Sequence, residues 1–189
     1  NYLYEKNLLD RVLLRFSSYE RFDFKKKYFK KIEWIWYDYF NDLKISQSSV
    51  NTEKWKNIEL PGRYDIFNDW EFDGAVWLRK DIEIVDITAD YTLLMGVIDD
   101  MDAVYFNGEK IGGLVGYGHH VTERVYTIPI ELLKKGKNSI AIRAVDTGGP
   151  GTITGTLELT NKNSITISLN GTWSYQPMAE IYNGRFYTY

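Results

Sequence analysis

Three closely spaced aspartates, Asp99, Asp100 and Asp102, are the sharpest candidates for chemistry in this sequence. Paired carboxylates can act as general acid and base, or can bind a hard cation such as Ca²⁺. Asp100 and Asp102 would share one face if a strand continued through the run. Aspartates at strand ends also accept backbone N–H bonds in turns. We favour a turn or a ligand contact, and we therefore assign no catalytic residue and no metal ligand.

The two histidines of the chain, His119 and His120, are adjacent and end a glycine-rich stretch over 112–120. Neighbours on an extended chain point to opposite sides, so we do not expect both to act on one substrate atom. Aromatic rings stack on sugar faces, and Asp and His side chains bond hydroxyl groups. The alternative for each residue is packing against a neighbouring segment. The candidate ligand-binding residues are Trp70, Asp73, Tyr117, His119 and His120.

Motifs for self-contained catalysis are missing from the sequence. It has no GxSxG elbow, no GxxxxGK[ST] and no GxGxxG, and zero Cys excludes thiolate zinc sites and Cys nucleophiles. The glycines at 148–151 follow an expected strand, but no helix follows them to bind a phosphate, so they indicate a loop. The sequence predicts no cofactor and no enzyme activity for this chain alone.

The composition limits the partners of the 189-residue chain. The formal net charge of −3 argues against general nucleic-acid binding and against binding to a membrane surface. No apolar run approaches the ~20 residues of a membrane span, and no signal peptide is recognisable in residues 1–20. Aromatic residues make up 16%, which suits either a carbohydrate-handling protein or a β-sandwich core. We give the core the larger share.

The elements that would position these residues fall into two unlike parts. Residues 1–45 carry a net charge of +3, no Gly and no Pro, and their apolar residues recur at helical spacing. The lysines at 25–31 indicate a solvated helix face rather than a phosphate site. We predict a helical segment over 1–45, a sandwich over 52–176, and a tail over 177–189 leading to the rest of a parent protein.

Period-two alternation dominates from about residue 52 onward. Apolar and polar residues alternate over 75–84, which predicts a half-buried strand. Asn107-Gly108 predicts a two-residue type I′ hairpin, and residues 131–135 before Gly136 predict one helical turn. Trp77 and Tyr105 lie within strands and are predicted to be core residues. Further strands are expected over 91–98, 103–106, 124–128, 139–145, 153–159 and 165–169.

Short sequence motifs in the predicted sandwich over 52–176 identify a family more specifically than the alternation of apolar residues does. We call these motifs words. Trp77-Leu78-Arg79-Lys80 and Asn107-Gly108 resemble the sugar-binding domain of family 2 glycoside hydrolases. The fuller words resemble the sandwich inserted into bacterial sialate O-acetylesterases, over about residues 55–175. Those words are Ile98-Asp99-Asp100-Met101-Asp102, Tyr105-Phe106-Asn107-Gly108, Gly136-Lys137-Asn138-Ser139-Ile140 and Asp146-Thr147-Gly148-Gly149.

This resemblance implies a mainly β fold, an antiparallel jelly-roll sandwich of the galactose-binding-like class. In that esterase family a serine hydrolase domain of the SGNH type carries the catalytic residues, and nothing here matches them. The resemblance therefore implies a non-catalytic domain that supports or extends the sugar site of a secreted or periplasmic bacterial esterase. Its partners would be the parent hydrolase domain and a glycan. Two alternatives stay open: a free-standing carbohydrate-binding module, and the sugar-binding domain of a family 2 glycosidase.

The chain departs from the esterase pattern in two places. Pro150-Gly151-Thr152 stands where the family often has a longer glycine run, and residues 1–45 match no family word.

Overall fold

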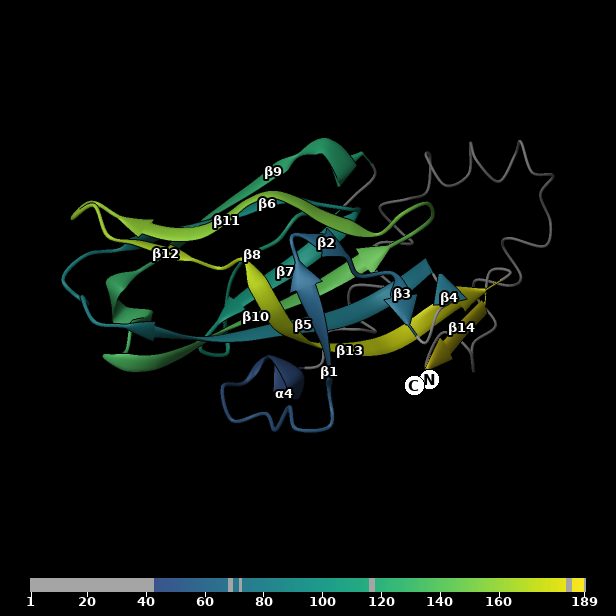
Figure 1. Cartoon of the computed structure of the whole chain (residues 1–189), viewed down its shortest axis with the longest axis horizontal. Helices are drawn as coiled ribbons and strands as arrows, with labels where there is room; N and C mark the ends of the chain where they lie inside the picture. Colours follow the sequence, from purple (N-terminus) through teal and green to yellow (C-terminus); the bar gives the residue numbers. More distant parts are fainter. Residues whose placement is uncertain (1–42, 68–69, 72, 116–117, 183–184, 189) are drawn as a thin grey trace.

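A computed structural model describes residues 43–67, 70–71, 73–115, 118–182 and 185–188 of the chain (Figure 1). The helical segment predicted over 1–45 lies outside the described residues, apart from a short helix, α4, at Leu43–Ser46. Among the described residues, no helix has the length and apolar character needed to cross a membrane. The described part is otherwise almost entirely β-structure.

Two antiparallel sheets face each other and form a sandwich (Figure 1). The larger sheet has the strand order β1-β13-β5-β10-β7-β8, with β14 paired to β13. Its strands are β1 (Lys56–Leu60), β5 (Asp73–Ile84), β7 (Met101–Phe106), β8 (Glu109–Gly112), β10 (Gly136–Asp146), β13 (Gly171–Tyr182) and β14 (Arg185–Thr188).

The smaller sheet has the strand order β12-β11-β6-β9, with β2 paired to β11, and β3 and β4 form a separate two-stranded ribbon. These strands are β2 (Gly62–Arg63), β3 (Ile66–Phe67), β4 (Trp70–Glu71), β6 (Tyr91–Ile98), β9 (Glu123–Ile128), β11 (Thr152–Asn161) and β12 (Thr166–Ser168).

The predicted fold class, an antiparallel jelly-roll sandwich, is confirmed. Every strand pair is antiparallel, and the chain passes repeatedly from one sheet to the other as it runs from β5 to β13. All the expected strands are present, with ends that match the prediction or differ from it by up to three residues. β13 continues to Tyr182, past the sandwich boundary expected at residue 176.

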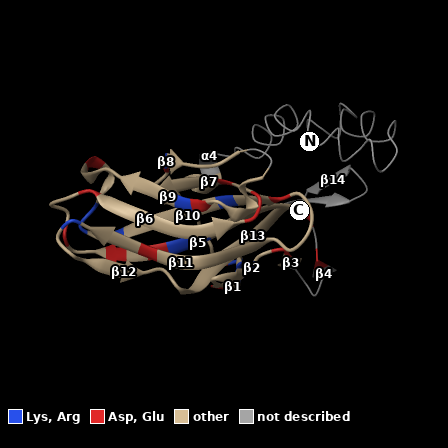
Figure 2. Cartoon of the chain, turned by 90° about the horizontal axis from the view of Figure 1, so that it is seen from above, with Lys and Arg blue, Asp and Glu red and all other residues tan. Residues whose placement is uncertain are grey.

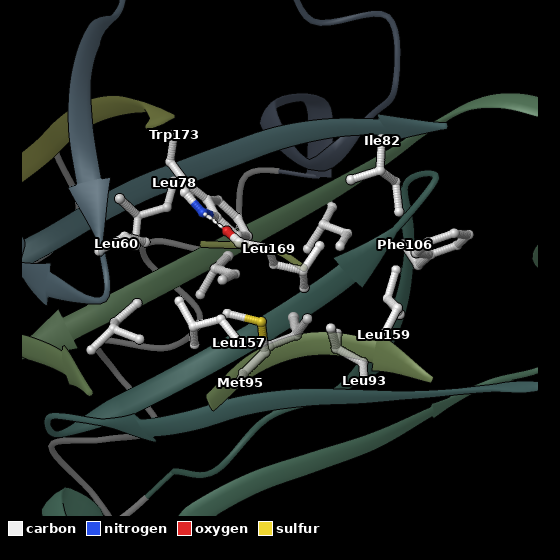
Figure 3. Packing of buried hydrophobic residues seen from close by; sticks show 14 of the residues in the cluster. Leu60, Leu78, Ile82, Leu93, Met95, Phe106, Leu157, Leu159, Leu169 and Trp173 are labelled. Carbon is white, nitrogen blue, oxygen red and sulfur yellow. Dashed lines mark hydrogen bonds between the residues drawn. The ribbon is translucent and has the colours of Figure 1, made fainter. Parts of the chain in front are cut away.

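The main core fills the space between the two sheets (Figure 3). Leu78 of β5 faces Leu93 and Met95 of β6 across this layer, and Phe106 and Leu159 close it toward one end. Trp173 is buried among them, and its indole Nε1–H donates a hydrogen bond to Leu169 O at 2.9 Å. A buried indole N–H that found no acceptor would cost stability, so this bond lets the largest core side chain sit in the interior.

The half-buried strand predicted over 75–84 is found only in its second half, where exposed Asp81 and Glu83 alternate with buried Ile82 and Ile84; the first half corrects the expectation. Both faces of β5 are covered near its start: Trp77 is 0% and Arg79 is 3% exposed on the face that was expected to be solvated. A second small cluster forms on this outer face. It comprises Trp77, Ala103, Tyr105 and Ala141, with Ile45, Trp55 and Met178 packed against it.

The predicted core roles of Trp77 and Tyr105 are confirmed by this burial. Their ring centroids lie 5.6 Å apart and the rings are tilted by 46°. The outer cluster is therefore a second small core. It forms because Ile45 and Trp55 pack against the outer face of the large sheet.

Two local predictions have different outcomes. Asn107 and Gly108 both have positive φ, 50° and 94°, which confirms the type I′ hairpin between β7 and β8. The turn predicted over 131–135 forms instead as a 3₁₀ turn, η2, at Ile130–Leu132. The reason is Asn138, whose side chain bonds both the N–H and the carbonyl of Lys134 and so takes the backbone groups a longer helical turn would need.

Candidate functional site

The predicted ligand residues whose side chains the structure describes lie at one end of the sandwich. Asp73 begins β5, and His119 and His120 belong to a 3₁₀ turn, η1, at His119–Val121 that precedes β9. Tyr117 and the side chain of Trp70 lie outside the described residues. We call this end the loop end; β6 finishes there at Ile98, and β7 starts there at Met101.

The turn between β6 and β7 carries Asp99 and Asp100. The Oδ2 atom of Asp100 accepts hydrogen bonds from Thr147 N at 2.9 Å and Thr147 Oγ1 at 2.6 Å. This is the structural role expected of a turn aspartate, and it is confirmed. The strand does not continue through the run, so Asp100 and Asp102 bind different partners instead of sharing a face.

Asp102 lies inside the molecule as half of an ion pair with Arg124, and the two side chains are 0% exposed. Arg124 Nε donates to Asp102 Oδ1 at 2.7 Å, and Tyr126 Oη donates to Asp102 Oδ2 at 2.6 Å. Burial and the negative charge of Asp102 raise the pKa of Tyr126 far above its usual range, so its hydroxyl stays a donor. A buried charge with this many bonds is a structural element rather than a reactive one.

The remaining nitrogens of Arg124 connect the two loops of the site. Nη1 donates to His119 O at 2.6 Å and to Thr122 O, and Nη2 donates to Asp100 O at 2.8 Å. One guanidinium thereby holds the η1 turn against the β6–β7 turn. Sequence analysis placed Arg124 in a strand but did not identify this role. A lone arginine among alternating strand residues gives no sign of what it will contact.

Asp99, Asp100 and His120 are brought together by this arrangement. Each offers one ligand atom, and these atoms all lie within 4.8 Å of one another. Asp99 and Asp100 are half-buried and His120 is exposed. Burial, a hydrogen bond with Asp100 and the negative charge of Asp100 raise the pKa of Asp99 to about 7. The two carboxylates are therefore close enough to resist carrying full charge together.

A further carboxylate, Asp146, ends β10 behind these residues and is 1% exposed. Its Oδ1 accepts a hydrogen bond from Gly148 N at 3.0 Å, while its Oδ2 has no hydrogen-bond partner. Burial and the charges of Asp73, Asp100 and Asp99 raise its pKa to about 8. Asp146 belongs to the sequence word Asp146-Thr147-Gly148-Gly149, which sequence analysis used only for family resemblance.

Tyr64 completes the buried part of the loop end. It is also 1% exposed, and its hydroxyl has no hydrogen-bond partner. Burial raises its pKa well above the usual value, and the charges of Asp146, Asp100, Asp99 and Asp65 add to this effect. A Cβ at Gly151 would lie 3.0 Å from Asp146 Oδ2 and 3.1 Å from Tyr64 Cε2. The glycine therefore makes room for both side chains.

The charges at the loop end do not balance locally. Among the described residues, Asp99, Asp100 and Asp146 form no ion pair. Of the arginines nearby, Arg124 is bound to Asp102, and Arg63 bonds Asp65 and Glu71 at 2.6 and 2.8 Å. Figure 2 shows acidic positions in the loops at this end, toward β14. The site can accept hydrogen bonds from hydroxyl donors or hold a positive charge.

Comparison with known proteins gives partial similarities. No family model matches the chain, and no curated protein matches it. Among solved structures, it resembles a β-glucuronidase of Bifidobacterium dentium (14% identity, TM-score 0.47, 57% of this chain and 17% of that chain). A β-glucuronidase of Bacteroides uniformis is similar at 17% identity and TM-score 0.47, over 69% of this chain and 15% of that one.

A lectin of Pleurotus ostreatus is similar at 22% identity and TM-score 0.47, over 68% of this chain and 36% of the lectin. The chain thus spans well under half the length of each of these structures. None of the three is a sialate O-acetylesterase.

Proposed function

We propose that this chain is a non-catalytic β-sandwich domain of a carbohydrate-active hydrolase, and that its loop end contacts the sugar. The observation that carries the proposal is the cluster of Asp99, Asp100 and His120 at the end of the sandwich where Asp73 begins β5. Carboxylates and imidazoles accept and donate hydrogen bonds to sugar hydroxyls. Because Arg124 fixes the two loops, these groups are pre-positioned and little ordering is needed on binding.

The parent enzyme we propose is a sialate O-acetylesterase, with an SGNH-type hydrolase domain as the partner in the same chain. The words shared with family 2 glycosidases are accounted for by the fold, since Trp77 is buried and Asn107-Gly108 is a turn. The word Ile98-Asp99-Asp100-Met101-Asp102, which resembles the esterase insertion, instead lies at the candidate site. The proposal of an esterase parent rests on this resemblance of sequence motifs.

The test of binding is a chemical-shift titration of the chain with sialic acid and with galactose. We expect perturbations at Asp73, the 112–120 segment and η1, with millimolar affinity. Asp73→Asn should weaken binding, whereas Glu83→Gln, an exposed acid at the other end of the same strand, should leave it unchanged. Perturbations confined to the opposite end of the sandwich would overturn the placement. No perturbation with either sugar would overturn the binding role.

The parentage is tested separately by the sequence flanking this domain in its gene. A serine-hydrolase domain beside it is expected, and a following TIM barrel would contradict the esterase in favour of a glycosidase. The purified chain should not hydrolyse p-nitrophenyl acetate or O-acetylated sialic acid. Turnover that co-purifies with the chain and survives the double variant His119→Gln, His120→Gln would overturn the non-catalytic assignment.

A further inference from the structure

The loop end has an excess of negative charge that its own residues do not neutralise. Asp99, Asp100 and Asp146 form no ion pair within the described part of the chain, and Asp146 is almost wholly buried. Burying a carboxylate without a compensating charge is unfavourable. Either protons or a bound cation must supply that compensation.

Two buried polar atoms at the loop end are a second observation, separate from the excess of carboxylates. Among the described residues, Asp146 Oδ2 and Tyr64 Oη find no hydrogen-bond partner, although both residues are 1% exposed. The Tyr64 hydroxyl lies within electrostatic range of Asp146, Asp100, Asp99 and Asp65. Buried polar atoms are normally satisfied by protein, ordered water or an ion. Both side chains lie beside Gly151, at the same end of the sandwich as the aspartates of the turn.

We infer that Asp99, Asp100 and His120 bind one divalent cation that accepts both oxygen and imidazole ligands, of the Zn²⁺ kind. Three protein ligands with a remaining open position are a frequent arrangement for Zn²⁺, and Asp and His are among its usual ligands. Asp146 immediately precedes Thr147, which hydrogen-bonds Asp100, so a third carboxyl group lies close to the cluster.

The geometry needs only a small adjustment to bind an ion. The three ligand atoms lie within 4.8 Å of one another. Two ligand atoms of one ion can be at most about 4.4 Å apart when each bond is about 2.2 Å long. His120 is exposed, so its side chain can move the short remaining distance. The cation would then join the β6–β7 turn to η1, the same two loops that Arg124 already connects from inside.

This inference does not rest on carbohydrate binding, although it concerns the same end of the sandwich. Metal binding without any response to sugar would support the cation site and count against the proposed function. Binding of sugar to chelator-treated protein, together with no response to metal, would do the reverse.

The experiment is isothermal titration calorimetry of the full chain with Zn²⁺, after chelator treatment and dialysis, and with Mn²⁺ and Ca²⁺ as comparison ions. We expect one Zn²⁺ per chain and a melting temperature that rises with Zn²⁺ concentration. Asp99→Asn and His120→Gln should each lower Zn²⁺ affinity by at least about tenfold. His119→Gln is the matched control, because it removes the neighbouring imidazole from outside the cluster and should leave the affinity unchanged.

Three results would overturn the inference. The first is the absence of stoichiometric Zn²⁺ binding by the folded chain. The second is unchanged Zn²⁺ affinity in Asp99→Asn and His120→Gln. The third is Ca²⁺ binding that equals Zn²⁺ binding and survives His120→Gln, because such a site would use oxygen ligands alone. Circular dichroism of the metal-free variants is the control that a variant without Zn²⁺ binding is still folded. Asp99→Asn should fold well, because it removes one of two neighbouring carboxylates that repel each other.

Discussion

Asn138 and Asp146, two buried polar residues at opposite ends of the sandwich, have contrasting surroundings. At the end away from the candidate site, Asn138 is 1% exposed and fully bonded. Its Oδ1 accepts from Lys134 N at 2.9 Å and Asn107 Nδ2 at 2.8 Å, and its Nδ2 donates to Lys134 O and Gly136 O. One neutral amide thereby fastens the β7–β8 hairpin to the start of β10.

Aspartates at the two ends show the same contrast. Asp86, at the far end, accepts bonds from Thr88, Asn161 and Asn163, and these hydrogen bonds lower its pKa to about 2. Asp146, at the loop end, has one such bond and nearby like charges, and its pKa rises to about 8. Neutral donors make an aspartate a structural residue. An aspartate left without them is available to a ligand, a cation or a proton.

The largest expected effect tests whether the loop end also contains a structural ion pair. Arg124→Met should destabilise the fold by about 3–5 kcal/mol, because it leaves Asp102 charged and buried without its partner. Urea unfolding followed by tryptophan fluorescence measures this change. The double variant Asp102→Asn, Arg124→Met should recover part of the loss. Equal losses in the single and double variants would show that Arg124 acts through its bonds to the loops instead.

Asn138→Ala tests the far end and should cost about 2 kcal/mol or more. The substitution leaves the Lys134 N–H and the Asn107 amide without an acceptor, at about 1–3 kcal/mol for each unsatisfied buried group. Exposed Asn57→Ala is the control and should change stability by less than about 0.5 kcal/mol. Similar unfolding midpoints for the two variants would contradict a structural role for this end.

Asp146→Asn should stabilise the chelator-treated protein by at least about 1 kcal/mol at pH 8, because each unit by which burial raises the pKa of Asp146 corresponds to about 1.4 kcal/mol. Its folded pKa of about 8 lies above the unfolded value, so the folded state binds more protons and the parent loses stability as the pH rises from about 4 to 8. The gain should therefore shrink toward pH 5. Melting curves across this range provide the measurement.

Asp86→Asn is the counterpart at the far end and should have the opposite sign. Because the folded pKa of Asp86 is depressed, its contribution is present above about pH 4 and is lost as the pH falls toward 2. The variant should melt below the parent at pH 7 and approach it at low pH. A loss of stability in Asp146→Asn at pH 8 would remove the contrast between the ends.

The smallest effect is expected from a pair of hydroxyl deletions. Tyr64→Phe removes a buried hydroxyl that has no partner, so it should leave stability unchanged or slightly raised. Tyr91→Phe removes a hydroxyl that donates to Asp86 O at 3.0 Å and should cost about 1 kcal/mol. Equal costs measured by urea unfolding would indicate that the Tyr64 hydroxyl also has a partner in solution.

Local patterns were sufficient to predict most of the β-structure. Alternating apolar residues located the strands, because successive side chains of a β-strand point to opposite faces of the sheet. Asn107-Gly108 defined its hairpin because few other dipeptides accept positive φ at both positions. For Asp99 and Asp100 the turn was one of the two interpretations kept open, but Thr147, which bonds Asp100, lies 47 residues further along the chain, and Asp102 lies in β7.

By itself, the sequence determined the strands, their turns, and the presence of an acidic segment near a glycine-rich one, since these depend on residues close together in the chain. Tertiary structure alone decided that the first half of β5 is buried on both faces, because Ile45 and Trp55 pack against its outer face. It also decided that Asp99, Asp100, His120 and Asp146 converge, and that Arg124 secures them. These contacts come from strand ends far apart in sequence, and only the pairing of the sheets brings those ends together.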